Sequence, residues 1–317
     1  MPYHITSLDE KTVRRLDDKL LIIKKLRPLP PSAVQKLRDQ FALEMTYNSN
    51  AIEGNKLTLK ETYLVISEGI TVKGKSLKDH LEAKDHFEAL HFLYDLVDHD
   101  KKHTMSEHLV RSLQQLVVAK SDREIAGTYR TGNVLITGSK HSPPDAIMVP
   151  ELMRKLISWV RSQANILHPV ELAALAHHRL VHIHPFLDGN GRTARLLMNL
   201  ILLQKGYPLV AILKNDRKKY YHVLEQADAG NLKPLVQFIA QAVERAMTLY
   251  LKTLAPSKLG NARLLPLSQV ATGTPFSEKY LNLLARTGKL EAHKEGRNWV
   301  SSKEALERYL ASRERKR

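Results

Sequence analysis

The chain has 317 residues, of which 43% are apolar and 26% are charged. This balance is typical of a folded globular protein and excludes collagen-like, low-complexity and mostly disordered chains. Because the sequence contains no cysteine, disulfides, thiolate zinc sites, iron–sulfur clusters and a cysteine nucleophile are excluded. It has no long uncharged apolar run, and its first twenty residues are too charged for a signal peptide. We therefore expect a cytoplasmic protein with no membrane contact.

The chain is strongly basic, with 49 Lys and Arg against 33 Asp and Glu, a net charge of +16. Such a charge attracts nucleic acids, nucleotides or acidic proteins, although a generally basic proteome explains it equally well. Residues 259–317 carry twelve Lys or Arg against six Glu. This density, which follows Pro256, Ser257 and Gly260, predicts a separate C-terminal module.

Helical periodicity dominates the rest of the chain, so the main body is predicted to be mainly α. Thr58 is a plausible N-cap for a helix that Gly69 ends, whereas Asn48, Ser49 and Asn50 either interrupt the preceding helix or begin a short second one. The other predicted helices cover 32–45, 78–99, 106–118, 150–164, 169–181, 193–206, 217–229 and 233–254.

The first clear break in this helical pattern lies between residues 127 and 150. Val134 to Thr137 is largely β-branched and is bounded by Gly132, Gly138 and a double proline. This pattern predicts a short β-hairpin or an extended flap.

Residues 182–195, HIHPFLDGNGRTAR, place polar and glycine residues between two apolar helices. Gly189 and Gly191 let backbone N–H groups converge, and the next helix, predicted to begin near Gly191 or Arg192, directs its positive end into the same space. Arg192 and Arg195 share one face of that helix and can each contact a different phosphate oxygen. The stretch therefore predicts a polyphosphate site.

Two further residues of this stretch suit the chemistry of a polyphosphate. Asp188 is a hard carboxylate that can hold Mg²⁺ beside phosphate oxygens. His184 is then available as a general base, because an imidazole is largely neutral at cellular pH. Taken singly, a histidine or a Gly-Asn-Gly turn is a weak signal that also occurs in ordinary core and loop positions. Their order and proximity favour a catalytic site.

The sequence HPFLDGNGRTAR resembles the complete Fic motif, His-Pro-Phe-x-(Asp/Glu)-Gly-Asn-Gly-Arg-x-x-Arg. The resemblance implies a protein adenylyltransferase, in which a Ser, Thr or Tyr hydroxyl of a target protein or of the enzyme itself attacks the α-phosphate of ATP. The resemblance implies that His184 accepts the hydroxyl proton and that Asp188 binds Mg²⁺. It implies that Gly189, Asn190 and Gly191 surround the phosphates, and that Arg192 and Arg195 contact the β- and γ-phosphates. Phe186 would anchor the loop in the core.

A second match, SNAIEGN at 49–55, resembles the inhibitory helix motif of the same family, (Ser/Thr)-x-x-x-Glu-(Gly/Asn). The resemblance implies that Ser49, Glu53 and Gly54 belong to an N-terminal inhibitory helix, at about 44–55. Glu53 would pair with Arg195 and occupy the space of the γ-phosphate; the alternative is a solvated helix carboxylate. Holding about 99% of molecules inhibited requires about 2.7 kcal/mol, which one partly buried Arg–carboxylate pair can supply.

Two more segments match the family in order along the chain. GTYR at 127–130 resembles the lead into the flap, so Val134 to Ser139 would hold the target peptide as an added strand. Residues 218–240 resemble the helix beside the adenine, although Asp228 stands where relatives often carry Asn. The full ATP-binding set that the resemblance implies is Glu53, Ile136, Thr137, Gly138, Ser139, Asp188, Gly189, Asn190, Gly191, Arg192, Thr193, Ala194, Arg195, Tyr220, Tyr221, Leu224 and Asp228.

From about Ser49 to Ala246 the sequence is most similar to the animal endoplasmic-reticulum branch of the family, whose members add and remove AMP on a chaperone. The chain lacks the membrane anchor and tetratricopeptide repeats of that branch, so the chaperone is not carried over as its substrate. Relatives commonly form homodimers through the segment after the inhibitory helix, which makes Leu77 the candidate contact. An ordinary buried leucine is the alternative.

Residues 264–310 are predicted to form a small winged-helix-like module: a helix from Ser268 to Ala271, a second helix capped by Ser277, a hairpin at 289–293 and 298–301, and a closing helix. In DNA-binding modules of this kind, the second helix enters the major groove and the wing contacts phosphates. Packing on the Fic core or on a protein partner is the alternative. The candidate DNA contacts are Lys279, Asn282, Arg286, Lys294 and Arg297.

The predicted organisation is thus an N-terminal helical region (1–105), a Fic-fold helical bundle with a β-hairpin flap (106–255) and an α+β winged-helix module (260–317). The predicted activity is AMP transfer from ATP with Mg²⁺, inhibited by Glu53. Removal of AMP at the same site is one alternative. A DNA-binding regulator whose Fic domain senses nucleotide is the other.

Overall fold

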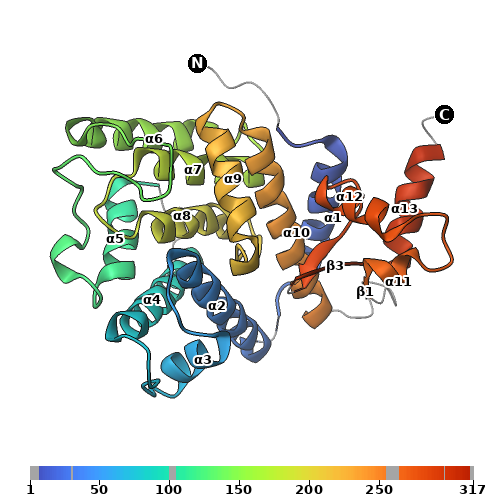
Figure 1. Cartoon of the computed structure of the whole chain (residues 1–317), viewed down its shortest axis with the longest axis horizontal. Helices are drawn as coiled ribbons and strands as arrows, with labels where there is room; N and C mark the ends of the chain where they lie inside the picture. The colour runs from blue at the N-terminus through green and yellow to red at the C-terminus, as the bar shows by residue number, and fades with distance from the viewer. Residues whose placement is uncertain (1–6, 30, 100–104, 255–263, 296, 315–317) are drawn as a thin grey trace. The chain divides into compact units, whose positions relative to one another are not determined.

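The structure is a computed structural model that describes residues 7–29, 31–99, 105–254, 264–295 and 297–314. The described residues form two compact units (Figure 1). The first contains Ser7, Leu8 and Pro28–Ile239, and the second contains Asp9–Arg27 and Ala240–Arg317. The predicted boundaries at 105 and 260 do not coincide with these units, and the division into functional domains stays a prediction. No helix in the described part of the chain has the length and apolar content that crossing a bilayer requires.

The first unit is a bundle of helices around α8 (Asn190–Gln204). Every residue of α8 from Arg192 to Leu203 is buried, and α2, α4, α5 and α7 contact it. Because α8 is buried on all sides, although it carries Arg192, Arg195 and Asn199, neighbouring helices hold the residues at its N-terminus. The surrounding helices are α2 (Pro31–Glu53), α3 (Leu59–Ser67), α4 (Leu77–His99), α5 (Glu107–Val118), α6 (Val149–Gln163), α7 (Pro169–Ile183), α9 (Arg217–Asp228) and the start of α10 (Lys233–Leu254), with short 3-10 turns at Arg123–Ile125, Ala146–Met148 and Lys214–Asp216.

These bounds confirm the predicted mainly α fold, and the local signals explain them. Thr58 caps α3 as expected and forms a reciprocal capping box with Glu61. Ser106 caps α5 by accepting a hydrogen bond from the N–H of Leu109.

The predicted interruption at residues 48–50 is wrong, because α2 runs unbroken from Pro31 to Glu53. The side chain of Asn48 donates to the carbonyl of Glu44 (2.8 Å) and accepts from the N–H of Lys214 (2.8 Å). The Asn50 amide donates to the carbonyl of Glu82 (3.2 Å). Tertiary partners therefore occupy the polar groups that would otherwise compete with the helix backbone.

The predicted β-hairpin of the flap is also wrong. Residues 128–140 contain no strand; the backbone is irregular and closes one turn, in which the N–H of Ser139 donates to the carbonyl of Ile136 (3.1 Å). A two-stranded ribbon with no third strand or covering helix gains little stability. The alternative interpretation of the same stretch, an extended flap, agrees with the structure.

The second unit combines α1 (Glu10–Lys25), the greater part of α10 and the C-terminal module. The module contains β1 (Leu265–Pro266), α11 (Leu267–Ala271), α12 (Glu278–Arg286), β2 (His293–Glu295), β3 (Asn298–Ser301) and α13 (Lys303–Glu314). Ser277 caps α12 as predicted. The strands form one antiparallel sheet in the order β1-β3-β2, so the predicted wing is present, although β2 begins later than expected and β1 was not predicted.

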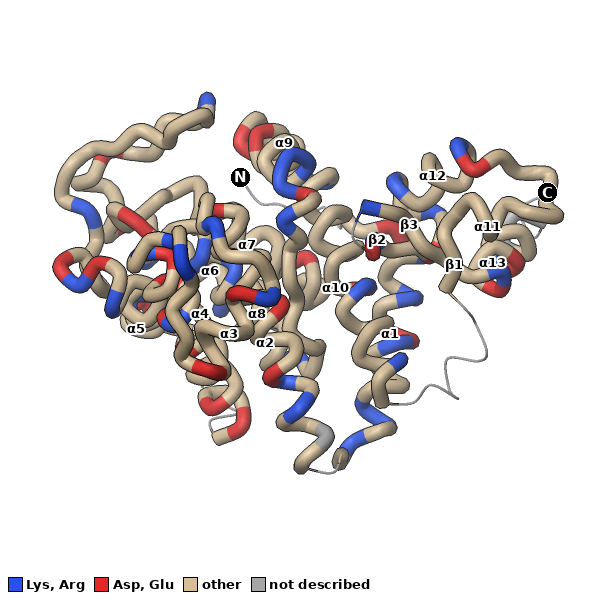
Figure 2. The backbone as a smooth tube through the Cα atoms, turned by 60° about the horizontal axis from the view of Figure 1, so that its bottom comes forward, with Lys and Arg blue, Asp and Glu red and all other residues tan. Residues whose placement is uncertain are grey.

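A buried ionic cluster joins the segments of the second unit. Glu244 is 4% exposed and accepts from Arg15 (2.9 Å) and Lys19 (3.2 Å), and Lys19 also pairs with Glu291 (2.6 Å). Burial alone would raise the pKa of Glu291, but Lys19 and Arg308 lower it to about 2. The contribution of Glu291 to stability is therefore present above its ordinary pKa and is lost as the pH falls towards 2. Figure 2 shows basic residues at several positions along α1, the helix to which Arg15 and Lys19 belong.

Candidate active site

The loop between α7 and α8 begins at a residue with unusual backbone geometry. His184 has φ 50°, the only positive φ among the described residues other than glycine, and it ends α7 with its N–H donating to the carbonyl of Leu180 (2.9 Å). A non-glycine residue in the left-handed region costs free energy and is common at functional sites. The surrounding structure thus fixes the position of the His184 side chain.

The loop is held closed by one side chain. Asn190 accepts from the N–H of Phe186 (2.9 Å) and donates to its carbonyl (2.8 Å), while the Phe186 ring is fully buried. The Asn190 side chain is therefore used within the loop, and only its backbone is available to a ligand.

We expect Asn190→Ala to lower the free energy of unfolding by about 2–4 kcal/mol, because the substitution leaves a buried N–H and a buried carbonyl of Phe186 without partners. Urea denaturation followed by circular dichroism measures the change. Asn231→Ala is the matched control, since Asn231 is exposed. Equal stabilities of the two variants would contradict the role given to Asn190.

Two glycines shape the N-terminus of α8. Gly189 is its N-cap with φ 82°, and a Cβ there would lie 3.2 Å from the side chain of Val118. At Gly191, a Cβ would overlap the Oε1 atom of Glu53. The absence of a side chain at Gly191 therefore lets a carboxylate, or a phosphate, approach the positive end of the helix.

The structure brings two of the three predicted inhibitory residues, Ser49 and Glu53, to Arg195. Arg195 is 1% exposed and donates to Glu53 Oε1 (2.7 Å), to Ser49 Oγ (2.9 Å) and to the Ser49 carbonyl (3.0 Å). Burial alone would lower the pKa of Arg195, but the Glu53 carboxylate raises it. Gly54, with φ 107°, follows directly after the end of α2.

Arg192 is the second buried guanidinium, at 2% exposure. It contacts the Val117 carbonyl (3.3 Å) and lies near Asp188 Oδ2 (3.4 Å) and Glu82 (3.6 Å). Lys78, which the sequence did not single out, lies 3.7 Å from the same oxygen of Asp188. Thr193 and Ala194 are fully buried in the first turn of α8.

Several buried polar atoms at this site have no hydrogen-bond partner among the described residues: His184 Nδ1, Arg192 Nε, Thr193 Oγ1 and Arg195 Nη1. Buried polar atoms are almost always paired in folded proteins. Their concentration around one helix N-terminus is what a site for a polar, anionic ligand requires.

Asp188 fits the predicted role of metal ligand. Its side chain is 45% exposed, and its Oδ1 accepts from the N–H of Gly189 (2.6 Å), which fixes the carboxylate at the edge of the anion site. A carboxylate beside phosphate oxygens is the environment that Mg²⁺ prefers.

His184 is poised to accept a proton. Burial lowers its pKa below the ordinary value of 6.5, an effect that the backbone of Val181 opposes in part and Arg130 reinforces. The imidazole is therefore neutral at neutral pH, as a general base must be.

Arg130 is a functional residue that the sequence analysis did not assign. It is 3% exposed, donates to the His184 carbonyl (2.8 Å), and also contacts the carbonyls of Gly132 and Pro144 at the two ends of the flap. One guanidinium thus connects the flap to the loop that contains His184. Arg130 is the last residue of the GTYR match, but only the tertiary contacts show that it connects the flap to the loop after α7.

The predicted flap residues lie at the surface: Thr137 and Gly138 are exposed, and Ile136 and Ser139 are half-buried. Leu135 is 88% exposed. No strand in the described part of the chain pairs with this segment, so its backbone groups outside the Ile136–Ser139 turn are not used in a sheet.

The predicted adenine contacts on α9 lie in different environments. Tyr221 is 38% exposed and donates to the carbonyl of Ile52, whereas Leu224 is buried. Tyr220 is 1% exposed and its hydroxyl lies 2.7 Å from His177 Nε2, so the tyrosine supports the core behind Arg195 rather than an open surface. Asp228 is paired with His178 and His182.

Leu77 is 70% exposed, so the interpretation of it as an ordinary buried leucine is wrong. It begins α4 beside α3, on which Leu59 and Tyr63 are 45% and 44% exposed.

Comparison with known proteins agrees with this geometry. Residues 104–202 match the model of the Fic/DOC family. The chain is 37% identical over 248 residues, 78% of its length, to Protein adenylyltransferase Fic of Drosophila willistoni, of which it covers 49%. The chain spans about half the length of the curated relatives it matches.

Solved structures extend the similarity to the fold. A Fic domain containing signaling protein from Bacteroides thetaiotaomicron is 34% identical with a TM-score of 0.70, and the match covers 77% of this chain and 97% of that one. Fic-1 from C. elegans is 30% identical with a TM-score of 0.69, covering 77% of this chain and 72% of the other. The motif, the helical bundle around α8 and these similarities together establish that the chain belongs to the Fic/DOC family.

Proposed function

We propose that this protein is a protein adenylyltransferase that transfers AMP from ATP to a hydroxyl of a target protein or of itself, and that Glu53 inhibits it. The observation that carries the proposal is the N-terminus of α8, where Gly191 and the buried Arg192 and Arg195 leave room for an anion next to His184, a half-buried histidine whose pKa burial lowers. The names of the curated relatives support the same reaction.

In the proposed reaction, the oxygen of a Ser, Thr or Tyr hydroxyl attacks the α-phosphorus of ATP while His184 accepts the hydroxyl proton. A new P–O bond forms to the target, the bond from the α-phosphorus to the bridging oxygen breaks, and pyrophosphate leaves. Arg192 and Arg195 offset the negative charge of the leaving pyrophosphate, and the N–H groups at the start of α8 position the phosphates.

Asp188 is the residue that would hold Mg²⁺. The ion would supply neutralisation of phosphate charge and orientation of the phosphate oxygens. Lys78 lies beside this carboxylate and adds a second positive charge at the same edge of the site.

Glu53 inhibits, on this proposal, by occupying the place of a phosphate. Its carboxylate pairs with Arg195 and stands where a Cβ of Gly191 would be. A nucleotide can then bind only with its terminal phosphate displaced, so that the α-phosphorus is not aligned with the attacking hydroxyl.

The discriminating experiment uses two radioactive forms of ATP. The Glu53→Gly protein, incubated with Mg²⁺ and ATP labelled at the α-phosphorus, is expected to retain the label, whereas ATP labelled at the γ-phosphorus leaves none. Retention of the γ-label would indicate phosphoryl transfer and overturn the proposal.

Removal of AMP at the same site is a second candidate, favoured by the exposure of the Glu53 side chain, which is 35% accessible and can reach a water molecule. Release of AMP from a modified target, lost in Glu53→Gly, is the expected result. A variant that still releases AMP would exclude this role of Glu53.

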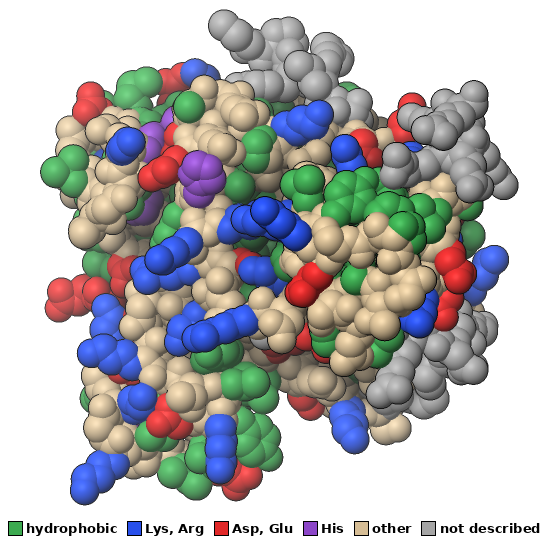
Figure 3. Space-filling view, turned by 45° about the vertical axis from the view of Figure 1, so that its right-hand side comes forward, with side chains coloured by type: hydrophobic (Ala, Val, Ile, Leu, Met, Phe, Trp, Pro, Cys, Tyr) green, Lys and Arg blue, Asp and Glu red, His purple; other side chains and the backbone are tan. Residues whose placement is uncertain are grey.

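We also propose that the C-terminal module contacts DNA. Lys279 and Arg286 on α12 and Arg297 on the wing are exposed and lie within one module. Lys and Arg side chains are spread across the face of the molecule in Figure 3, in keeping with the net charge of +16.

Each phosphate contact contributes about 0.9 to the slope of log affinity against log salt concentration. The triple Ala variant of Lys279, Arg286 and Arg297 should therefore reduce the magnitude of this slope by up to roughly 3. Fluorescence anisotropy with labelled duplex DNA over a salt series measures it. A triple Ala variant at three exposed cations of the first unit, Arg123, Arg154 and Lys218, is the control. An unchanged slope in the first variant would exclude DNA binding through the module.

The exposed apolar side chains of Leu59, Tyr63 and Leu77 support a homodimer through α3 and α4. Leu77→Asp is expected to convert a dimer into a monomer, because it buries a charge at the contact. Light scattering after gel filtration gives the mass; a wild-type monomer at all concentrations would exclude this interface.

A further inference from the structure

Three side chains outside the phosphate site converge from three segments of the first unit. His141 follows the flap, His182 lies in the last turn of α7, and Asp228 is the last residue of α9. One ligand atom from each lies within 4.8 Å of the other two. Two imidazoles and a carboxylate are a donor set that divalent transition metals bind in proteins.

The geometry within the cluster is close to that of a metal site. His182 Nδ1 lies 2.9 Å from Asp228 Oδ1, and the rings of His141 and His182 stack with centroids 4.1 Å apart. In a tetrahedral zinc site, metal–ligand distances near 2.1 Å place the ligand atoms about 3.4 Å apart. An ion would displace the proton that His182 Nδ1 donates to Asp228 Oδ1, and small side-chain adjustments would separate these two atoms enough to admit it.

Two contacts orient these side chains in the way that metal sites require. His141 Nε2 lies 2.8 Å from the carbonyl of His182, so this nitrogen carries the proton and Nδ1 keeps its lone pair. His178 Nε2 lies 2.9 Å from Asp228 Oδ1, the oxygen that also contacts His182, and so restrains the carboxylate. Metal-binding histidines usually donate their second N–H to a carbonyl, and metal-binding carboxylates are usually hydrogen-bonded.

The charge of the cluster also suits a cation. Asp228 contributes a carboxylate whose Oδ1 lies 2.9 Å from His178 Nε2 and 2.9 Å from His182 Nδ1. A carboxylate supplies the negative charge that a divalent ion needs from its ligands.

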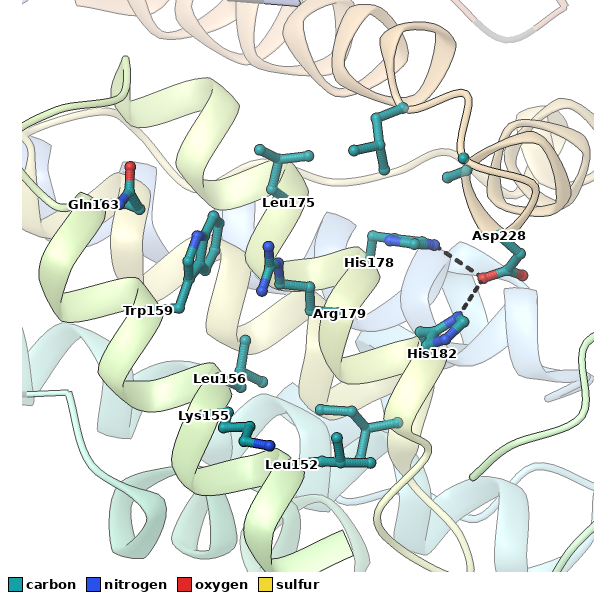
Figure 4. A pocket seen from close by; sticks show the side chains of 14 residues that line it. Leu152, Lys155, Leu156, Trp159, Gln163, Leu175, His178, Arg179, His182 and Asp228 are labelled. Atoms are coloured by element: carbon teal, nitrogen blue, oxygen red, sulfur yellow. Dashed lines mark hydrogen bonds and ion pairs between the residues drawn. The ribbon is translucent and has the colours of Figure 1, made fainter. Parts of the chain in front are cut away.

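The cluster is accessible from solvent. The His182 side chain is 42% exposed and that of Asp228 is 21% exposed. Both, with His178, line one end of a pocket of about 650 Å³ between α6, α7 and the end of α9, shown in Figure 4. An ion can therefore enter, and a water molecule can complete four-coordination.

We propose that His141, His182 and Asp228 bind a divalent transition-metal ion, with Zn²⁺ as the best fit to the donor set, and that His178 is a positioning residue for the carboxylate. The ion would join the chain just after the flap to α7 and α9. Because His141 stands two residues after Ser139, occupancy would restrain the flap.

The test uses full-length protein without a histidine tag, treated with a chelator and then dialysed. Isothermal titration with Zn²⁺ is expected to give one site, and Co²⁺ is expected to produce the visible absorption of a tetrahedral complex. Asp228→Asn and His182→Ala should abolish this site, and His178→Gln should weaken it by about 10- to 100-fold, as loss of an outer contact does. His222→Ala, an exposed histidine on α9, is the matched control.

A second measurement separates a metal site from a hydrogen-bonded cluster. Zn²⁺ should slow amide exchange in residues 139–146 of the wild type and of His222→Ala, but not of Asp228→Asn. The proposal is wrong if wild type and Asp228→Asn bind Zn²⁺ equally. It is also wrong if every variant with wild-type circular dichroism binds Zn²⁺ as the His222→Ala control does; the cluster is then a hydrogen-bond network only. Neither readout depends on AMP transfer.

Discussion

Glu53→Gly is expected to raise the rate of self-modification with ATP and Mg²⁺ by about 100-fold. If the pair between Glu53 and Arg195 holds about 99% of molecules in the inhibited form, removing it releases nearly all of them. The substitution also clears the space above Gly191 that a phosphate needs. Intact-protein mass spectrometry over time measures the gain of one AMP mass.

Two further variants separate inhibition from a change in fold. Glu53→Gln keeps the size of the side chain but removes its charge, so an intermediate rate is expected. Glu68→Ala, at an exposed glutamate, should behave as wild type. If Glu53→Gly takes up no more AMP than wild type while binding nucleotide, Glu53 is not the inhibitory group.

His184→Ala in the Glu53→Gly background is expected to reduce AMP incorporation by about 10²- to 10⁴-fold, the usual contribution of a general base. The α-phosphate label of ATP, quantified on gels in the linear phase, gives the rate. Nucleotide affinity should change little, because the phosphate contacts come from α8.

The left-handed backbone at His184 requires a second variant. Asn tolerates this conformation better than Ala, so His184→Asn preserves the loop while removing the base. Equal loss in both variants supports proton transfer, whereas activity retained in His184→Asn would attribute the Ala effect to the backbone.

The pH dependence follows from the lowered pKa of His184. The base acts when neutral, so the rate should rise with pH through a value below 6.5 and stay level at neutral pH. A rate that continues to rise well above pH 7 would show that another group controls proton transfer.

The sequence predicted most of the fold because the helices are long and strongly periodic. α4, α9 and α10 begin and end within a residue of their predicted limits, and the caps at Thr58 and Ser277 form as expected. These features depend on contacts between residues a few positions apart, which a sequence displays directly.

The predictions failed where distant contacts decide the local structure. Asn48 and Asn50 lie within a continuous α2 because residues of other segments pair with their side chains. The N–H of Lys214 donates to Asn48, and the carbonyl of Glu82 accepts from Asn50. The flap forms no β-hairpin because no third strand among the described residues pairs with it, and an isolated pair of strands gains little stability.

The sequence by itself determined which residues make up the candidate phosphate site, since its glycines, arginines, aspartate and histidine lie within twelve consecutive residues. The tertiary structure chose between the two interpretations of Glu53 by placing its carboxylate on Arg195. Only the tertiary structure showed that Arg130 connects the flap to His184 and that His141, His182 and Asp228 meet. The physical reason is separation along the chain: side chains from different helices come within bonding distance only when the buried helix α8 and its neighbours fix where each helix lies.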